Sequence, residues 1–294
     1  MKRFSDGRAL AILNPAAGRG RVHRKLRELA TILRESGRVD IAHTAAPGDG
    51  ARLAREAAEE GYERVIAVGG DGTVHDVVNG VLGSELRLAI VPLGSANDLA
   101  CVLGIRDWRA AARNALRGPY RPIDVALANG RAFANALGVG ADTAAARVVE
   151  RHKPYLGPLA YLTAAITTAA TYQPEVVRVC FDGEVIEGRH LLVVVSNSGR
   201  FGNGMRVAPQ AELDDGMLDL CIVAETTRME NFRLLPLVYF GAHVGHPKVR
   251  IERVREVVIE QGARSAVQYD GELAEAARIE VSCIPLGLWV VTPP

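Results

Sequence analysis

The sequence predicts an α/β domain built on a parallel sheet, followed by a β-rich sandwich domain. Strand-like and helix-like segments alternate over the first part of the chain with short connections, a pattern typical of parallel sheets covered by helices. Beyond Pro119, short apolar runs are separated by Asn-Gly and Asp-Gly pairs, which favour hairpin turns. We place the first domain at 1–122, with 286–294 returning to it as a last strand, and the second domain at 123–285.

Apolar spacing predicts each element of the first domain. For example, Leu26, Leu29 and Leu33 recur at helical spacing, and Gly37 closes the helix that they predict. The predicted strands are Ala9–Leu13, Val39–His43, Val65–Val68 and Leu86–Val91, and the predicted helices are Arg21–Ser36, Ala51–Glu60, Val74–Leu82 and Asp107–Leu116.

The second domain contains two hairpin signals, Asn129-Gly130 and Asp182-Gly183, and an Ala- and Thr-rich segment, 143–172, that predicts one long helix. The remaining apolar runs predict strands. These strands are Asp124–Ala128, Ala132–Val139, Val176–Phe181, Val185–Ile186, Leu191–Val195, Leu218–Val223, Val254–Glu260, Ala266–Tyr269, Arg278–Cys283 and Leu288–Val291.

Composition excludes several classes of protein. Hydrophobic residues make up 48% of the 294 residues and charged residues 23%, which excludes a mostly disordered chain. A formal net charge of +1 gives no global basis for binding nucleic acid. The four cysteines lie far apart, so reduced thiols are expected rather than disulfides or a zinc site. No signal peptide or membrane span is predicted, and we expect a cytoplasmic protein.

The strongest motif is the loop Gly69–Thr73 (GGDGT), which joins a buried strand to a helix. Glycines let backbone N–H groups approach phosphate oxygens, and the helix N-terminus adds a favourable dipole. The carboxylate of Asp71 suits such a loop if it holds a cation or a water bound to that cation. A capped strand–helix turn would explain two glycines alone, but the whole loop favours phosphate binding.

Two further polar loops follow strands, Asn14–Gly20 and Pro92–Asp98. In the first, Arg19 could reach a phosphate, although an ordinary strand–helix turn explains the loop equally well. In the second, Asn97 or Asp98 could be a helix cap. Three such loops at the carboxyl ends of parallel strands indicate a ligand site, because open α/β sheets bind ligands at that edge.

Near the C-terminus, Asp270-Gly271-Glu272 would place two carboxylates on one face if the segment is extended. A solvated Asp-Gly hairpin turn is the alternative, and it is the commoner outcome for such a pair in isolation. The segment Asp214–Gly216 likewise predicts a turn, and a turn can also gather oxygen ligands around magnesium.

Together these motifs resemble the diacylglycerol kinase and sphingosine kinase superfamily, in particular its soluble bacterial lipid kinases. The resemblance rests on the order and spacing of NPAAGRG, GGDGTVHDVVNG, PLGSANDLA, DDGMLD, GAHVGHPKV and YDGE along nearly the whole chain. It implies an NAD kinase-like, Rossmann-like ATP-binding domain joined to a β-rich domain, with the active site in the cleft between them.

The resemblance also implies roles for particular residues. Asp270 and Glu272 would be the acid/base pair, and Asp71 and Asp98 would join a hydrated magnesium network. A second, structural magnesium site would use Glu212, Asp215 and Met217. Nucleotide contacts would come from Asn14, Gly18, Arg19, Thr44, Gly69, Gly70, Asp71, Gly72, Thr73, Val74, His75, Gly94, Ser95, Asn97 and Asp98.

Other candidate groups are weaker. His243 and His246 could share a helix face, but no third metal ligand is evident, so structural roles are favoured. Ser95, Leu99 and Arg19 differ from the residues that are common at these positions in the lipid kinases that the sequence resembles, so the sequence leaves the lipid acceptor open. The basic cluster Arg147–Lys153 is a solvated helix face by default and a contact for anionic lipid headgroups as the alternative.

The sequence therefore predicts a lipid kinase that uses ATP and Mg²⁺, with diacylglycerol as the favoured acceptor. It would touch the membrane transiently, bind no nucleic acid and form a homodimer. Other lipid alcohols, an NAD kinase-like enzyme and a non-catalytic lipid-binding regulator are the alternatives. The apolar candidates for an acyl-chain pocket are Leu137, Val139, Leu156, Leu159, Leu162, Leu234, Leu235 and Phe240.

Overall fold

The chain divides into two compact units. Unit 1 comprises Met1–Val125 with Leu286–Pro294, and unit 2 comprises Ala126–Pro285. Two strands, β5 (Tyr120–Ala128) and β15 (Arg278–Val291), carry the chain from one unit to the other. The computed structural model describes residues 7–17, 21–36, 38–156, 159–263 and 265–294.

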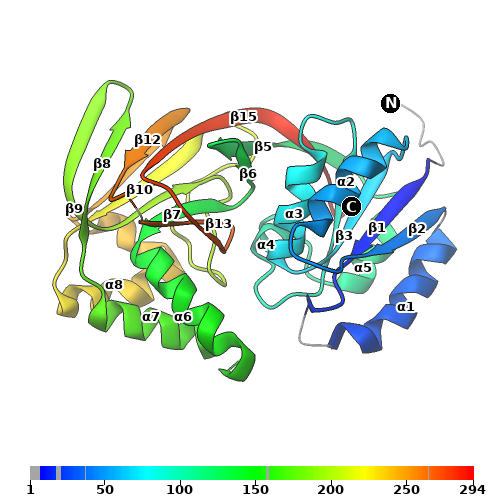
Figure 1. The fold of residues 1–294 in the computed structure, drawn as a ribbon, viewed down its shortest axis with the longest axis horizontal. Helices are drawn as coiled ribbons and strands as arrows, with labels where there is room; N and C mark the ends of the chain where they lie inside the picture. The colour runs from blue at the N-terminus through cyan, green and yellow to red at the C-terminus, as the bar shows by residue number, and fades with distance from the viewer. Residues whose placement is uncertain (1–6, 18–20, 37, 157–158, 264) are drawn as a thin grey trace. The chain divides into compact units, whose positions relative to one another are not determined.

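Unit 1 is built on a parallel sheet in the order β2-β1-β3-β4, and the last part of β15 extends it (Figure 1). Trp289 and Val290 of β15 pair in parallel with Arg87 and Leu88 of β4. Every residue of β1 and β3 is buried, as expected for parallel strands with helices on both faces. The bounds are β1 (Ala9–Leu13), β2 (Val39–His43), β3 (Arg64–Gly69) and β4 (Arg87–Pro92).

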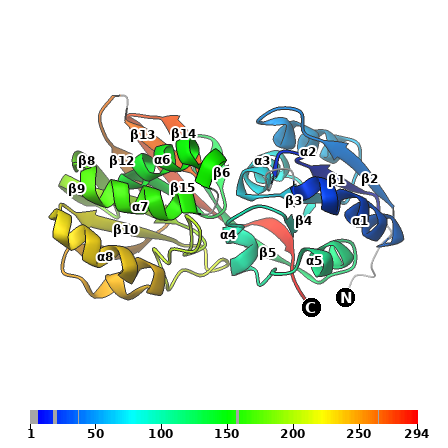
Figure 2. The ribbon, with the colours of Figure 1, turned by 90° about the horizontal axis from the view of Figure 1, so that it is seen from below.

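Helices cover both faces of this sheet (Figure 2). Leu29 and Leu33 of α1 (Arg21–Ser36) and Trp108 of α5 (Trp108–Asn114) share one core with Ile66 of β3. On the other face, α2 (Asp49–Glu59) packs closely on α3 (Asp71–Val81). A short helix, α4 (Asp98–Val102), follows β4. This layering leaves the carboxyl ends of the strands to the loops that carry the predicted phosphate contacts.

Unit 2 is a mostly antiparallel β structure in the order β14-β13-β7-β9-β8-β12-β15, with β10 and β11 added beside β9. Its core is formed by inward-facing strand residues such as Leu137, Val195, Leu220 and Ile259. The bounds are β6 (Arg131–Phe133), β7 (Ala136–Gly140), β8 (Glu175–Phe181), β9 (Glu184–Ser196), β10 (Leu218–Ala224), β11 (Val249–Val254), β12 (Glu256–Glu260), β13 (Ala266–Tyr269) and β14 (Glu272–Glu275).

Three α-helices of unit 2, α6 (Ala141–Leu156), α7 (Leu159–Thr171) and α8 (Arg228–Phe240), lie together in Figure 1. A 3-10 turn, η2 (Ala242–Gly245), follows α8. The predicted fold class, a parallel α/β part and a β-rich part, is thus confirmed.

Several predicted boundaries in unit 2 were wrong. The run 132–139 is two strands, because Ala134 and Asn135 bond a carboxylate instead of continuing one ladder. The single helix expected over 143–172 is divided into α6 and α7. The helix α8 was not predicted, because its own apolar residues are spread over all of its faces and Pro236 interrupts the helical pattern.

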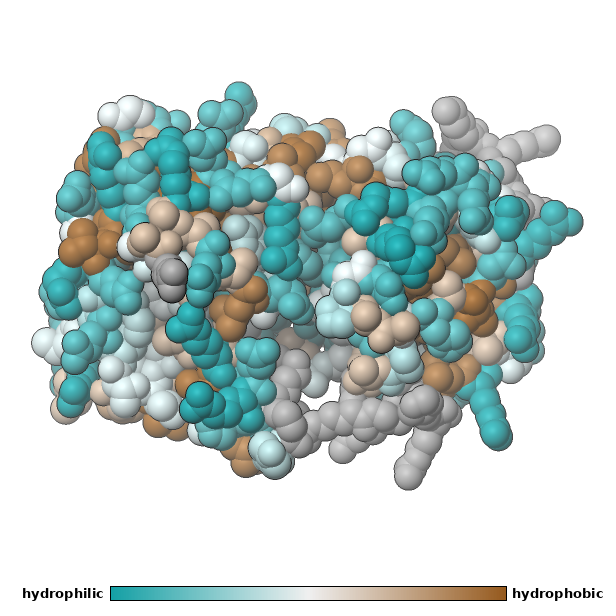
Figure 3. Space-filling model, in the orientation of Figure 1, coloured by the Kyte–Doolittle hydropathy of each residue, from teal (hydrophilic) through white to brown (hydrophobic). Residues whose placement is uncertain are grey.

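Hydrophilic side chains predominate on the face drawn in Figure 3, with hydrophobic ones scattered among them. Within the described part of the chain, no helix is long and apolar enough to cross a membrane. Large exposed hydrophobic side chains are nonetheless numerous on the helices of unit 2: Tyr155, Leu156, Leu159, Leu162, Ile166, Met229, Phe232, Leu237 and Phe240.

Candidate active site

In unit 1, the loops after β3 and β4 pack backbone against backbone. A Cβ atom added to Gly94 would lie 2.4 Å from Gly70 Cα, and one added to Gly69 would lie 2.2 Å from Thr73 Oγ1. Contacts this short exclude any larger residue without a backbone shift. Gly70 and Gly94 therefore pack backbone against backbone and bring the two loops together, whereas Gly69 makes room for the Thr73 side chain of its own loop.

Asp71 ties these loops to each other. Its Oδ2 accepts the Asn97 N–H at 2.8 Å, and its Oδ1 accepts the Asp98 N–H at 2.7 Å. Asn97 has a left-handed backbone (φ 53°), and its own Oδ1 accepts the Gly94 N–H at 3.0 Å. The sequence predicted a cation-binding role for Asp71 but missed this loop-holding role, which only the fold reveals.

The first and second strands deliver two more predicted residues to the same edge of the sheet. Asn14 Nδ2 donates to Thr73 Oγ1 at 3.2 Å, so the loop after β1 is joined to the start of α3. The Thr44 N–H donates to the Leu13 carbonyl at 2.9 Å, just beyond the end of β2. Four successive strand ends thus carry the predicted nucleotide contacts.

The remaining predicted nucleotide contacts differ in how accessible their side chains are. Ser95 is exposed, whereas Asp98 is 6% exposed. The side chains of Val74 and His75 are buried, and the His75 carbonyl accepts a hydrogen bond from Asn79 Nδ2 at 2.9 Å. These two residues can therefore offer a ligand only backbone groups. Gly18 and Arg19 lie outside the described residues.

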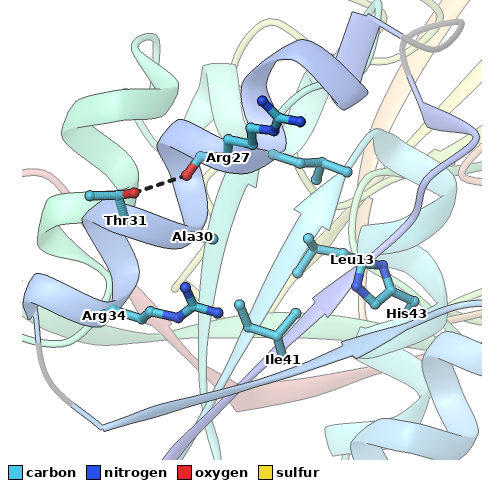
Figure 4. Close-up of a pocket in the computed structure, with 8 residues that line it drawn as sticks. Leu13, Arg27, Ala30, Thr31, Arg34, Ile41 and His43 are labelled. Carbon is cyan, nitrogen blue, oxygen red and sulfur yellow. Dashed lines mark hydrogen bonds between the residues drawn. The ribbon is translucent and has the colours of Figure 1, made fainter.

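A groove of about 540 Å³ lies elsewhere in unit 1, between α1 and the strands β1 and β2 (Figure 4). Arg27, Arg34 and His43 contribute polar groups to its wall, and Leu13 and Ile41 contribute apolar ones. None of the residues predicted to bind nucleotide lines this groove. The candidate phosphate site is therefore defined by the loops and not by this hollow.

In unit 2, the predicted carboxylates occupy a tight hairpin between β13 and β14. Asp270 (φ 50°) and Gly271 (φ 96°) both have positive φ, and Tyr269 pairs with Glu272 across the turn. Two positive φ values are the signature of a type I′ turn. The expectation that Asp270 and Glu272 share one face of an extended segment is wrong, because the chain reverses between them.

The two carboxylates of this turn have different surroundings. Asp270 accepts three backbone N–H groups, from Ala134 and Asn135 at 2.9 Å and from Ala136 at 3.0 Å. Glu272 is exposed, and among the described residues no hydrogen bond or ion pair engages its carboxylate. Asp270 therefore holds the β6–β7 loop, while Glu272 is available for chemistry.

Two buried polar residues that the sequence did not indicate support the same loop. Asn197 Nδ2 donates to the Ala134 carbonyl at 2.9 Å, and Ser198 Oγ donates to Asn135 Oδ1 at 3.0 Å. Both residues follow the long strand β9 and are almost fully buried. The run of polar residues after an apolar strand was their sequence signal, since buried polar groups need partners.

The predicted structural magnesium site forms a turn with an ion pair already in place. Asp215 Oδ1 accepts the Met217 N–H at 2.9 Å, and Asp215 Oδ2 pairs with Arg253. Burial raises the pKa of nearby Asp219 to about 6, with Asp215 and Glu212 adding to the increase and Arg253 opposing it. Oxygen donors suit Mg²⁺, so the residues fit the ion, but its charge would compete with Arg253. Among the described residues, no three His, Cys, Asp or Glu side chains form a ready metal cluster.

Two further residues are buried. His243 is 3% exposed, and its Nε2–H donates to the Val207 carbonyl at 3.0 Å, as expected for a structural histidine. Burial lowers the pKa of His243.

Asp124 of β5, which the sequence did not single out, is fully buried and accepts the Leu286 N–H at 2.7 Å.

Two family models match successive parts of the chain. The family model for the diacylglycerol kinase catalytic domain matches residues 8–128, and the model for the YegS C-terminal NAD kinase beta sandwich-like domain matches residues 135–292. The chain belongs to the diacylglycerol kinase family. The prediction of an ATP-dependent lipid kinase is confirmed at this level.

Individual members of the family resemble the chain over nearly its whole length. It is 31% identical over 271 residues to a diacylglycerol kinase of Bacillus subtilis, covering 90% of this chain and 89% of that one. It is 30% identical over 270 residues to a diacylglycerol kinase of Staphylococcus carnosus, covering 90% and 88%. A crystal structure of a diacylglycerol kinase from Bacillus anthracis superposes with a TM-score of 0.82 at 27% identity, covering 98% of each chain.

Proposed function

We propose that this family member transfers the γ-phosphoryl group of ATP to the hydroxyl of a lipid, with diacylglycerol as the favoured acceptor. The observation that carries the proposal is the contrast within the 270–272 turn. Asp270 is engaged by three backbone N–H groups, whereas the exposed carboxylate of Glu272 stands on the turn that Asp270 fixes. An exposed carboxylate on a turn that another residue fixes suits a general base.

Unit 1 would bind ATP through backbone and side-chain groups at its strand ends. The glycines of the loop after β3 would present N–H groups to phosphate oxygens, and α3 begins directly behind them. Gly94 would contribute its close packing, because its N–H is already accepted by Asn97 Oδ1. Asn14 and Thr44 would add side-chain contacts, with Gly69, Gly70, Gly72, Thr73, Val74, His75, Gly94, Ser95, Asn97 and Asp98 completing the site. Gly18 and Arg19 keep the roles that the resemblance implies.

Unit 2 would supply the base. Glu272 would accept the proton of the lipid hydroxyl as its oxygen attacks the γ-phosphorus. The bond from that phosphorus to the bridging oxygen of ADP breaks, and the pair of electrons leaves with ADP. Phosphoryl transfer depends mainly on positioning and charge stabilisation, so a rigid turn beneath the base is an advantage.

Magnesium, when bound, would neutralise phosphate charge. Asp71 and Asp98 are the candidates near the phosphate loops, and each Asp71 oxygen can accept a further contact besides its backbone N–H. Glu212, Asp215 and Met217 would hold the structural ion. All of these donors are oxygens, as Mg²⁺ prefers.

Exposed apolar side chains on unit 2 support a lipid substrate. Leu159, Leu162 and Ile166 stand on one exposed stripe of α7, a helix without a charged residue. Of the expected acyl-chain contacts, Leu137, Val139 and Leu234 lie in the core, whereas Leu156, Leu159, Leu162 and Phe240 are exposed. Arg147 and Arg151 on neighbouring α6 would favour anionic headgroups during transient membrane contact.

Phosphate transfer from γ-labelled ATP to separate lipids in mixed micelles tests the proposal. Diacylglycerol, monoacylglycerol, phosphatidylglycerol, ceramide and sphingosine would be compared, with NAD as a soluble acceptor. We expect label in diacylglycerol. Label in NAD alone would contradict a lipid acceptor, and label in another lipid would reassign the acceptor.

A further inference from the structure

The groove between α1 and the strands β1 and β2 has no part in the proposed reaction, yet it has the composition of a binding site (Figure 4). Its volume of about 540 Å³ lies within the range of about 300–1,000 Å³ that is usual for small-molecule sites. Eight residues line it, and all of them belong to unit 1. The side chains on its two walls show which ligand it would take.

The helix wall of the groove is one stripe of α1. Arg27, Ala30, Thr31 and Arg34 follow the spacing i, i+3, i+4 and i+7, so their side chains lie on one face of the helix. The two arginines are seven residues apart, which is about 10.5 Å along the helix axis. The small side chain of Ala30 leaves the space between them open.

The strand wall of the groove is apolar, with a histidine at its end. Leu13 of β1 and His43 of β2 are register partners in the parallel ladder. Ile41 stands two positions before His43, so both side chains point to the same face of the sheet. Figure 4 shows Arg34 extending from α1 toward Ile41. The groove therefore has an apolar floor with basic groups along its margins.

The positive charges of the groove are not neutralised. No Asp or Glu is among the described residues that line it, and within the described ranges the guanidinium groups of Arg27 and Arg34 form no ion pair or hydrogen bond. Arg109 of α5, by contrast, pairs with Glu28 of α1. The hydroxyl of Thr31 already donates to the Arg27 carbonyl at 3.1 Å. The groove thus offers a ligand two free guanidinium groups beside apolar surface.

We propose that this groove is a second ligand site, separate from the predicted nucleotide site, and that it binds an anionic lipid with a single acyl chain. The Arg34 guanidinium would hold the carboxylate or phosphate headgroup through charge-assisted hydrogen bonds, and Arg27 would add to the positive potential. The chain would lie over Leu13, Ala30 and Ile41. A small polar anion would leave this apolar floor facing water, and a neutral lipid would leave the arginines without a partner.

The site borders the nucleotide contacts without sharing them. Leu13 and His43 end their strands one residue before Asn14 and Thr44, but neither of those two residues lines the groove. The lipid and the nucleotide should therefore bind at the same time. Because the groove lies wholly in unit 1, it would bind its ligand whether or not unit 2 accepts a lipid substrate.

Calorimetric titration of the full chain, with saturating ADP present, tests the site. The ligands are oleate and oleoyl lysophosphatidic acid, which carry the same chain on a carboxylate and on a phosphate headgroup, each below its micelle-forming concentration. Oleyl alcohol has the chain without the charge, and inorganic phosphate has the charge without the chain. Binding that disappears in Ala30→Glu is assigned to the groove. We expect such binding for both anionic lipids and for neither control ligand.

The variants change the charge of the groove and preserve the helix. Ala30→Glu places a carboxylate between the arginines, and Glu four residues before Arg34 is a favourable helix pair, so α1 should stay intact. Arg34→Gln should weaken lipid binding about tenfold, and Arg27→Gln by less. Arg55→Gln, at an exposed arginine of α2 on the other face of the sheet, is the matched control and should bind as wild type does. ADP affinity should be unchanged in all four variants.

Three results would overturn the site. Equal lipid affinity in wild type, Arg34→Gln and Ala30→Glu would show that the lipid binds elsewhere. Displacement of the lipid by ADP would place it in the nucleotide site. Inorganic phosphate that binds as tightly as the lipids, and that Ala30→Glu also removes, would show a site for a small anion and not for an acyl chain.

Discussion

Asp270 and Ala136 exchange two hydrogen bonds. The Asp270 N–H donates to the Ala136 carbonyl at 2.9 Å, and the Ala136 N–H donates to Asp270 Oδ1 at 3.0 Å. The turn is therefore fixed by the loop that its own carboxylate organises. This reciprocity assigns different tasks to two carboxylates that stand only two positions apart in the sequence.

Substitutions at the two carboxylates should separate these tasks. Glu272→Gln should abolish phosphoryl transfer while nucleotide affinity and unfolding free energy stay near wild type. Asp270→Asn should lose activity and also about 1–3 kcal/mol of stability, because an amide accepts poorly in place of a carboxylate that bonds three N–H groups. Chemical denaturation and a nucleotide-binding titration measure these effects. Equal stability loss in both variants would contradict the division.

The packed glycines of unit 1 provide a second test. Gly94→Ala should destabilise the protein by about 1–3 kcal/mol and weaken ATP binding, because its Cβ would lie 2.4 Å from Gly70 Cα. Gly245→Ala is a matched control, since a Cβ there would meet nothing within 4 Å. Thermal unfolding with and without ATP gives both effects. A Gly94→Ala protein with the control's stability would show that the loops do not pack in this way.

Asp71 should contribute both to the stability of the loops that it joins and to the binding of magnesium–ATP. Asp71→Ala leaves the Asn97 and Asp98 N–H groups without their carboxylate acceptor, so we expect lower stability and at least tenfold weaker binding of magnesium–ATP. Calorimetry with ATP, in the presence and absence of Mg²⁺, measures the binding. Thr31→Ala, in the separate groove of unit 1, serves as the control. Unchanged affinity in Asp71→Ala would refute the role.

Arg253 should compete with magnesium at the 212–217 turn. It pairs with Asp215 Oδ2, so Arg253→Gln should free that oxygen and strengthen Mg²⁺ binding, seen as a larger rise in Tm on adding Mg²⁺. Asp215→Asn should remove the Mg²⁺-dependent rise from this turn. If Arg253→Gln reduces the Mg²⁺ effect, the ion does not use this carboxylate.

The difference in unfolding free energy between Asp142→Asn and wild type should depend on pH. Burial raises the pKa of Asp142 in α6 from 3.8 to about 7, so between these pH values the folded chain keeps a proton that the unfolded chain releases. Stability from this group is present at low pH and lost as pH rises through 7. Relative to pH 4, Asp142→Asn should therefore gain up to about 4 kcal/mol over wild type by pH 8.

Urea unfolding at pH 4, 6 and 8 measures this difference. Asp219, whose pKa is also raised, stays in both proteins and cancels. A constant difference across the three pH values would show that the Asp142 carboxyl group is not buried as described.

Much of the α/β fold could be predicted from local sequence. The helix Arg21–Ser36 and the strands Ala9–Leu13 and Val39–His43 have the bounds that were predicted. Their apolar periodicity is strong, and glycines mark the ends of elements. The helix α8 was missed because its apolar residues have no single face, although Thr227 and Glu230 form a capping box that could have indicated its start.

The candidate site was predictable in its motifs but not in its long-range contacts. The sequence shows that Asp71 and Asp270 lie in motifs. The backbone N–H groups that donate to their carboxylates, however, lie 26 or more positions away in the sequence. Asp142 belongs to none of the motifs. Its carboxyl group lies over Gly138 only because α6 packs on β7.

Transfer of the γ-phosphate to diacylglycerol in mixed micelles, measured for wild type and Glu272→Gln side by side, tests both the lipid acceptor and the role of Glu272 as the base. We predict labelled phosphatidic acid from the wild type and none from the variant, with equal ATP binding by both proteins. Equal labelling by the two proteins would contradict Glu272 as the base, and label in NAD but in no lipid would contradict the lipid acceptor.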